Sequence, residues 1–173
     1  DAERPWETCM TLGTQWAWKP DDKIKTTAEV LRILANCAGG DGNLLLNVGP
    51  MPTGEIEARQ ADRLREMGRW LAIHGESIYG TRGGPWRPQP WGVSTQKSRT
   101  AWLHLLHWPP EGKVTLPAIG PRVASARVMG GPAVTVEASG GSLGLRVPEA
   151  ARQPVDTIVR LDFDADIAGV PAG

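Results

Sequence analysis

The sequence predicts a chain in two parts, a parallel α/β segment followed by a small antiparallel β-sandwich. A short apolar run at residues 44–48 lies between two helical patterns, which is the helix–strand–helix order of parallel α/β folds. A passage rich in Pro and Gly follows at residues 79–90. Beyond it, short segments alternate apolar and polar residues, as the strands of a sandwich do. We therefore expect two domains, at residues 1–84 and 85–173.

The first elements are set by local signals. Residues 6–12 read as a strand, followed by a loop that holds Trp16 and Trp18. Thr26 stands three residues before Glu29, which is the spacing of a capping box at a helix start. An apolar face then continues to residue 38, and the pair Gly39-Gly40 predicts the helix end.

The run at residues 44–48 predicts a strand that is buried on both faces, because its apolar residues are nearly continuous. Asn47 lies late in this run, where an unpaired buried amide would cost a few kcal/mol. Its side chain is therefore either paired within the fold or directed into a cleft. Ligands of parallel α/β folds gather at the carboxyl ends of strands, so Asn47 is a candidate site residue.

A second helix is expected at residues 56–73. Its predicted buried face is apolar and spaced at helical intervals. The members of this face are Ala61, Leu64, Met67, Trp70 and Leu71.

The second part predicts six strands with turns between them. Their expected ranges are 100–108, 113–116, 123–129, 133–138, 143–147 and 157–163. The last shows the clearest alternation, with Val159, Leu161 and Phe163 on one face.

Composition excludes several classes of partner. The 173 residues include 19 basic and 19 acidic side chains, so the net charge is zero and no nucleic-acid partner is expected. No run of about 18 apolar residues is present, and a membrane span is not expected.

Cys9 and Cys37 have no metal-binding spacing and are expected to be buried thiols. His104 and His107 lie three apart on a strand and so face opposite ways, which predicts no shared metal or acid–base pair.

Four motifs resemble those of the alpha-L-fucosidases, glycoside hydrolase family 29. They occur in order as Trp6-Glu7-Thr8-Cys9-Met10, Trp16-Ala17-Trp18, the segment at 42–50 and the segment at 75–81. The resemblance implies the closing part of a (β/α) barrel joined to a β-sandwich, and cleavage of terminal alpha-L-fucose with retention. It implies no cofactor and no metal.

The resemblance also assigns roles. A retaining glycosidase uses two carboxyl groups, a nucleophile and an acid/base. The family nucleophile lies before the Trp-Glu motif, and no residue here matches it. Glu7 takes the acid/base role, and Trp6 beside it supplies an apolar wall that would raise its pKa. Trp16 and Trp18 would contact the sugar, with Asn47 at the pocket or holding its loop.

The implied partner is a fucosylated glycan or a small fucoside. A partial barrel would expose strand edges, so we expect a homo-oligomer or pairing with the missing N-terminal barrel segment. Two alternatives stay open, namely a non-catalytic carbohydrate-binding module and an oligomerising fragment. Should the chain alone hydrolyse fucosides, Asp21, Asp22 and Asp41 are the nucleophile candidates to test first.

Overall fold

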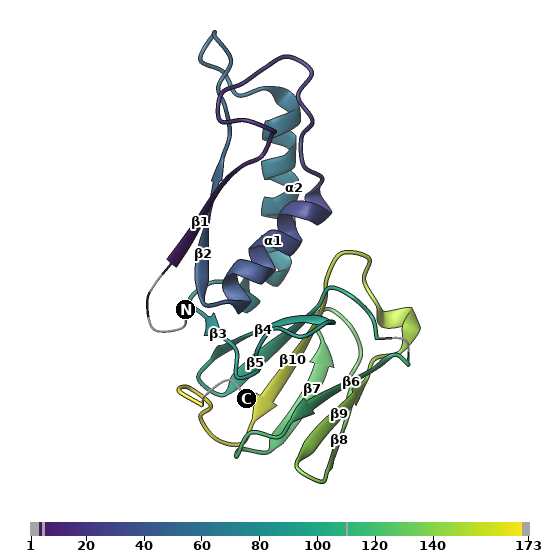
Figure 1. Ribbon diagram of the computed structural model, residues 1–173. Helices are drawn as coiled ribbons and strands as arrows, with labels where there is room; N and C mark the ends of the chain where they lie inside the picture. The colour runs from purple at the N-terminus through teal and green to yellow at the C-terminus, as the bar shows by residue number, and fades with distance from the viewer. Residues whose placement is uncertain (1–3, 5, 110, 171–173) are drawn as a thin grey trace.

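The computed structural model describes Arg4 and residues 6–109 and 111–170. A narrow α/β part stands on a broader part made of two antiparallel sheets (Figure 1). This arrangement confirms the predicted fold class of α/β followed by all-β. The division of the chain at residues 84 and 85 stays a prediction.

The α/β part is built on two parallel strands. Strand β1 (Trp6–Thr11) pairs with β2 (Gly42–Asn47) in a register that runs from Trp6 opposite Gly42 to Thr11 opposite Asn47. Helix α1 (Thr27–Gly39) connects them. Its capping box is complete, with Thr26 and Glu29 bonded to each other's backbone N–H, as the sequence predicts.

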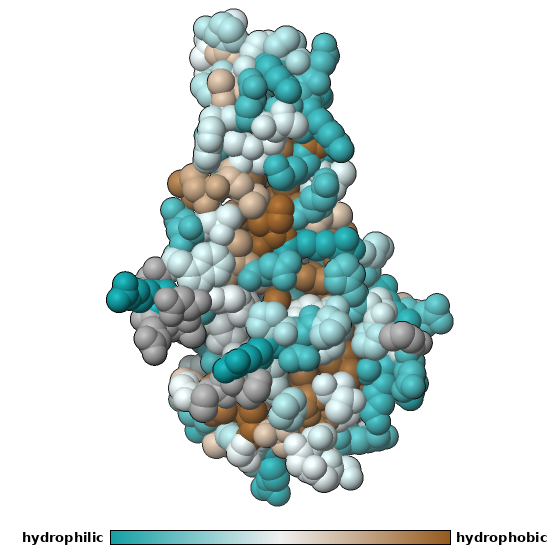
Figure 2. Space-filling view, in the orientation of Figure 1, coloured by the Kyte–Doolittle hydropathy of each residue, from teal (hydrophilic) through white to brown (hydrophobic). Residues whose placement is uncertain are grey.

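The prediction that the central strand is buried on both faces is wrong. Leu44 and Leu46 are partly buried, whereas Leu45 is 50% exposed. Successive side chains of a strand point to opposite faces, and the helices α1 and α2 cover one face only. Figure 2 shows apolar residues at the surface over this part of the molecule. The open face also carries Glu7 and Cys9, so the expectation that Cys9 is buried is wrong as well.

Helix α2 (Ala58–His74) follows β2 and leads into the short 3-10 helix η1 (Gly75–Ser77). Its predicted apolar face is only half covered, since Leu64 is 38% exposed. The buried residues of α2 lie instead near its two ends, at Gln60 and His74. The helix is therefore held near its start by the polar contacts of Gln60 and near its end by the packing of Trp70 against Trp102 and Ile158 of the larger sheet.

The second part consists of two sheets. Their order is β3-β4-β5-β10-β7 in one and β6-β9-β8 in the other. The strands of the first are β3 (Arg82–Gly83), β4 (Gly92–Lys97), β5 (Thr100–Leu105), β10 (Thr157–Phe163) and β7 (Val123–Val128). Those of the second are β6 (Lys113–Pro117), β9 (Ser142–Arg146) and β8 (Thr135–Ser139). The six predicted strands are confirmed as elements, and β3 and β4 were not predicted.

One apolar core fills the space between the sheets. It joins Leu103, Val159 and Leu161 of the larger sheet to Val114 and Leu145 of the smaller one. Val159, Leu161 and Phe163 all lie in this core, as their alternation predicts. None of the described helices is long and apolar enough to cross a membrane.

The α/β part rests on the other face of the larger sheet. Ala35 of α1 packs against Val93 and Leu106, and Arg160 of β10 binds Glu76 of η1 at 3.2 Å. Beneath this contact, His104 Nδ1 lies 2.6 Å from Asp156 Oδ2, with both side chains fully buried. His107 is exposed and lies two residues beyond the end of β5, so the prediction that it shares a strand with His104 is wrong.

Candidate functional site

The carboxyl ends of β1 and β2 form one edge, and two loops rise from it. Thr11 and Asn47 lie side by side there, and Leu12 N–H donates to the Asn47 carbonyl at 2.9 Å. The loops at residues 12–26 and 48–57 follow directly. Since ligands of parallel α/β folds bind at such edges, this is where site residues are expected.

Asn47 holds the first of these loops. Its Nδ2 donates to the Trp16 carbonyl at 3.0 Å. The side-chain amide of Asn47 is therefore paired within the fold, which is one of the two alternatives that the sequence left open. The Trp16 indole itself is 57% exposed. A side chain at Gly49 would stand 2.5 Å from Trp18 N and 3.0 Å from Trp16 O, so only glycine permits the two loops to approach this closely.

Trp18 is fixed from the second loop. Its Nε1 donates to Glu57 Oε2 at 2.9 Å, at the residue that precedes α2. A hydrogen bond from Arg59 and a weaker one from Trp18 lower the pKa of Glu57 below its usual value. Glu57 is therefore a carboxylate at neutral pH.

Gln60 supports the same loop and was not singled out in the sequence. Its side chain is buried and bonds both backbone groups of one residue: Oε1 accepts from Gly49 N–H at 3.2 Å and Nε2 donates to Gly49 O at 3.3 Å. A polar residue in the first turn of a helix is normally expected to face solvent, so nothing in the sequence indicated that Gln60 would be buried.

Asp22 organises the first loop. Its carboxylate accepts from Thr14 N–H at 2.9 Å and from the Thr14 hydroxyl at 2.6 Å, and it pairs with Lys19 at 3.3 Å. The bonds from Thr14 lower the pKa of Asp22 to about 2. Lys25 Nζ closes the loop base by donating to the Thr11 and Gly13 carbonyls at 2.7 and 3.1 Å. Asp22 thus acts as a loop anchor that stays ionised.

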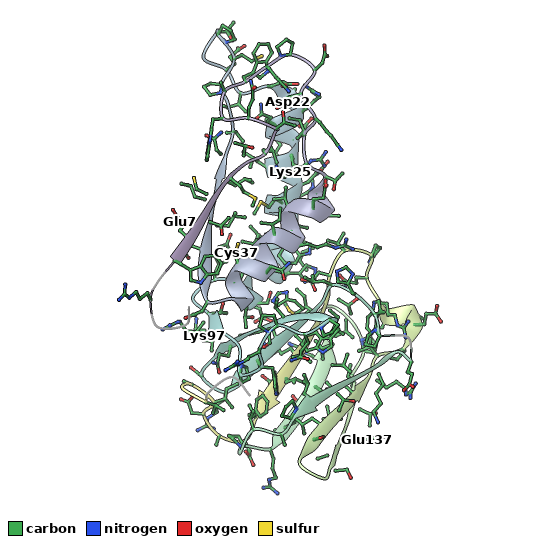
Figure 3. All side chains as sticks on the ribbon, in the orientation of Figure 1. Glu7, Asp22, Lys25, Cys37, Lys97 and Glu137 are labelled. Atoms are coloured by element: carbon green, nitrogen blue, oxygen red, sulfur yellow. The ribbon has the colours of Figure 1, made fainter. Side chains whose placement is uncertain are left out.

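Glu7 and Trp6 lie at the opposite ends of the strands. Glu7 is in register with Asn43, four residues before Asn47, which corresponds to about 13 Å along the strand. Its side chain is exposed on the face turned away from α1 and α2, well separated from Asp22 and Lys25 (Figure 3). Trp6 Nε1 donates to the Gly40 carbonyl at 2.9 Å. The predicted site residues therefore fall into two groups, with Trp16, Trp18 and Asn47 together and Trp6 and Glu7 apart.

This placement does not support an acid/base role for Glu7 at the carboxyl edge. A sugar bound beside Trp16 would have to extend roughly 13 Å down the open face to reach it. The two carboxyl groups of a retaining glycosidase act about 5 to 5.5 Å apart. The assignment of Glu7 from the motif remains a prediction.

The described residues contain no group of three or more His, Cys, Asp and Glu side chains that could hold a metal ion. Burial raises the pKa of the Cys37 thiol, which keeps it protonated at neutral pH.

Comparisons with known proteins all lead to one family. The family model described as Alpha-L-fucosidase matches residues 1–76. An alpha-L-fucosidase from Branchiostoma floridae is 33% identical over 159 residues, which cover 84% of this chain and 35% of that protein.

Solved structures agree. Alpha-L-fucosidase isoenzyme 1 from Paenibacillus thiaminolyticus superposes with a TM-score of 0.82 at 32% identity, covering 92% of this chain and 40% of that one. A trapped covalent intermediate of a family 29 alpha-L-fucosidase from Bacteroides thetaiotaomicron shares the fold, with a TM-score of 0.81 at 24% identity over 95% of this chain and 39% of that one.

The fold, the motifs and these relatives agree over nearly all of the chain, although it spans only about a third of the length of the curated relative from Branchiostoma. By sequence and by fold, the chain matches part of the alpha-L-fucosidases, glycoside hydrolase family 29.

Proposed function

We propose that this chain forms part of the substrate-binding face of a retaining glycosidase that releases terminal alpha-L-fucose from glycans or small fucosides. The observation that carries the proposal is the convergence of Trp16, Trp18 and Asn47 at the carboxyl edge of β1 and β2. The exposed Trp16 indole offers a flat apolar surface to the methyl group and C–H face of a deoxy sugar.

Retention of configuration is supported by a relative. The Bacteroides thetaiotaomicron enzyme was trapped as a covalent intermediate with a 2-fluoro-fucosyl fluoride, in a glutamate-to-glutamine variant. A covalent glycosyl-enzyme is the intermediate of the two-step retaining mechanism, in which one carboxylate attacks and the other carboxyl group first donates and then accepts a proton.

The carboxyl groups of Asp22 and Glu57, in the loops at the carboxyl edge of β1 and β2, are ionised at neutral pH. The pKa values of Asp22 and Glu57 are both lowered, which is the opposite of what a group that protonates a leaving oxygen needs. Both are also engaged with neighbouring side chains. We therefore propose that these two residues shape the loops and do not transfer the proton.

Hydrolysis of an aryl alpha-L-fucoside by the product of the whole reading frame tests the proposal. We expect hydrolysis with retained anomeric configuration, and a Trp16→Ala variant about tenfold lower in kcat/KM through the lost stacking surface. A folded product that does not hydrolyse the fucoside would overturn the proposed function.

The same assay decides the role of Glu7. Removal of an acid/base lowers kcat by about a hundredfold or more, so Glu7→Gln would lose most activity if the motif assignment holds. Activity near that of the unchanged protein would fit the position of Glu7 at the amino end of β1. Glu137→Gln, a change at an exposed carboxylate of β8, is the matched control.

One observation favours a second role, as an oligomerising chain. In the described residues β1 and β2 pair only with each other, so each leaves one edge unpaired beside the exposed Leu45. Light scattering over a range of concentrations would show a rising mass if these edges drive self-association, and a constant monomer mass would exclude it.

A further inference from the structure

A concave surface lies at the amino ends of β1 and β2, opposite to the carboxyl edge. It encloses about 490 Å³ between the strand starts, the end of α1 and the turn that leads from η1 to β3. Its volume is in the range of small-molecule sites. The residues that matter for its chemistry are Trp6, Asp41, Tyr79, Thr81 and Arg82. We call this surface the amino-end groove.

Trp6 is seated in the groove by glycines. A Cβ at Gly42 would stand 2.2 to 2.5 Å from three atoms of the indole, so the ring lies directly over the Gly42 backbone. Gly40 accepts the Nε1 hydrogen bond, and a Cβ there would also touch the ring at 3.1 Å. The indole is therefore held in one orientation before any ligand arrives, which reduces the entropy cost of binding.

Tyr79 provides a second aromatic surface. Its ring packs over Gly75, where a Cβ would come within 2.8 Å, and the side chain is still 63% exposed. A large exposed aromatic residue beside a preformed hollow is a frequent feature of binding sites.

The charged residues of the groove are paired with each other. Arg82 donates to both carboxylate oxygens of Asp41, at 2.8 and 2.6 Å, and the Gly83 N–H adds a third bond at 2.7 Å. The guanidinium holds the pKa of Asp41 below its usual value, so the pair stays charged at neutral pH and has no net charge. Asp41 adopts a left-handed backbone conformation at φ 62°, and the three hydrogen bonds to its carboxylate stabilise this conformation.

Two aromatic rings, a neutral ion pair and a hydroxyl at Thr81 match one ligand chemistry. A pyranose has an apolar C–H face, which stacks on aromatic rings, and a rim of hydroxyls, which bond amides and planar charged groups. The absence of net charge disfavours an anionic or cationic ligand. We propose that the amino-end groove binds a neutral saccharide.

This proposal does not depend on the proposed function. Asn43 is four residues from Asn47, so a sugar in the groove lies about 13 Å from the carboxyl edge. Binding at the groove can therefore be present or absent whether or not the protein hydrolyses fucosides.

Titration of the 173-residue chain with L-fucose and, separately, with lactose tests the proposal by protein-observed NMR. We expect shifts of the Trp6 indole N–H and the Tyr79 backbone amide for at least one of the two sugars. Tyr79→Ala should weaken that binding about tenfold, and Tyr79→Phe should keep it, because stacking needs the ring and not the hydroxyl.

Ile73→Ala is the matched control, since Ile73 of α2 is 68% exposed and does not line the groove. Glucuronate should bind no more tightly than the neutral sugars. The proposal fails if shifts appear only around Trp16, Trp18 and Asn47, if neither sugar shifts any groove residue at about 50 mM, or if Tyr79→Ala binds as tightly as the unchanged chain.

Discussion

The contact between Gln60 and Gly49 gives the sharpest test of how the carboxyl edge is built. The Gln60 amide is 4% exposed and satisfies both the N–H and the carbonyl of Gly49. Gln60→Leu keeps a similar volume but removes the donor and the acceptor together. Each buried backbone group left without a partner costs about 1–3 kcal/mol. Both hydrogen bonds are long, at 3.2 and 3.3 Å, so the lower half of that range applies. Two groups at about 1–2 kcal/mol each give an expected loss of about 2–4 kcal/mol in the free energy of unfolding.

Urea denaturation followed by circular dichroism measures this loss. For a urea m-value of about 2 kcal/mol per molar, the midpoint should fall by roughly 1–2 M. Gln89→Leu, at an exposed position in the turn before β4, should change stability by no more than about 0.5 kcal/mol.

A second variant, Gln60→Glu, tests the same contact through the pH dependence of stability. In Gln60→Glu the ionised carboxylate faces the Gly49 carbonyl, whereas the protonated acid can donate to it and still accept from the Gly49 N–H. The deficit relative to the unchanged chain should therefore be smaller near pH 4 than near pH 7 (about the range in which a glutamate titrates). A Gln60→Leu variant within about 0.5 kcal/mol of the unchanged chain would refute the proposed support.

Three further predictions concern other parts of the fold. The pKa of Asp22 is lowered from 3.8 to about 2, so its contribution to stability is complete above pH 3.8 and is lost as the pH falls through about 2. Asp22→Asn should thus be less stable than the unchanged chain at pH 7 and nearly equal at pH 2, and an equal deficit at both pH values in urea titrations would contradict this. Gly42→Ala should destabilise by about 1–3 kcal/mol because the new methyl collides with Trp6, whereas Gly68→Ala, in open space on α2, should stabilise by about 0.5–1 kcal/mol. Thermal melts in which both variants shift the melting temperature in the same direction would contradict this prediction. Leu103→Ala, at a fully buried core position, should lower the free energy of unfolding by about 2–5 kcal/mol. Leu64→Ala, on the exposed side of α2, should lower it by less than about 1 kcal/mol. Similar losses for the two variants in urea titrations would contradict the assignment of Leu103 to the core and Leu64 to the surface.

The sequence alone determined the features that depend on neighbours along the chain. The capping box of Thr26 and Glu29 located the start of α1, and the alternation of Val159, Leu161 and Phe163 identified the core face of β10. These succeed because a helix cap spans three residues and a strand repeats every two, so both signals lie within a few positions of each other. The motifs likewise sufficed to indicate the family.

Only the tertiary structure decided which residues meet. The parallel register places Glu7 beside Asn43 and Thr11 beside Asn47, which separates the predicted acid from the Trp16 loop. Gln60 reaches Gly49, and His104 reaches Asp156 across 52 positions. Strand register and buried polar pairs come from contacts between segments that are distant in the chain, and a hydrophobic pattern carries no information about how far one strand is shifted along another.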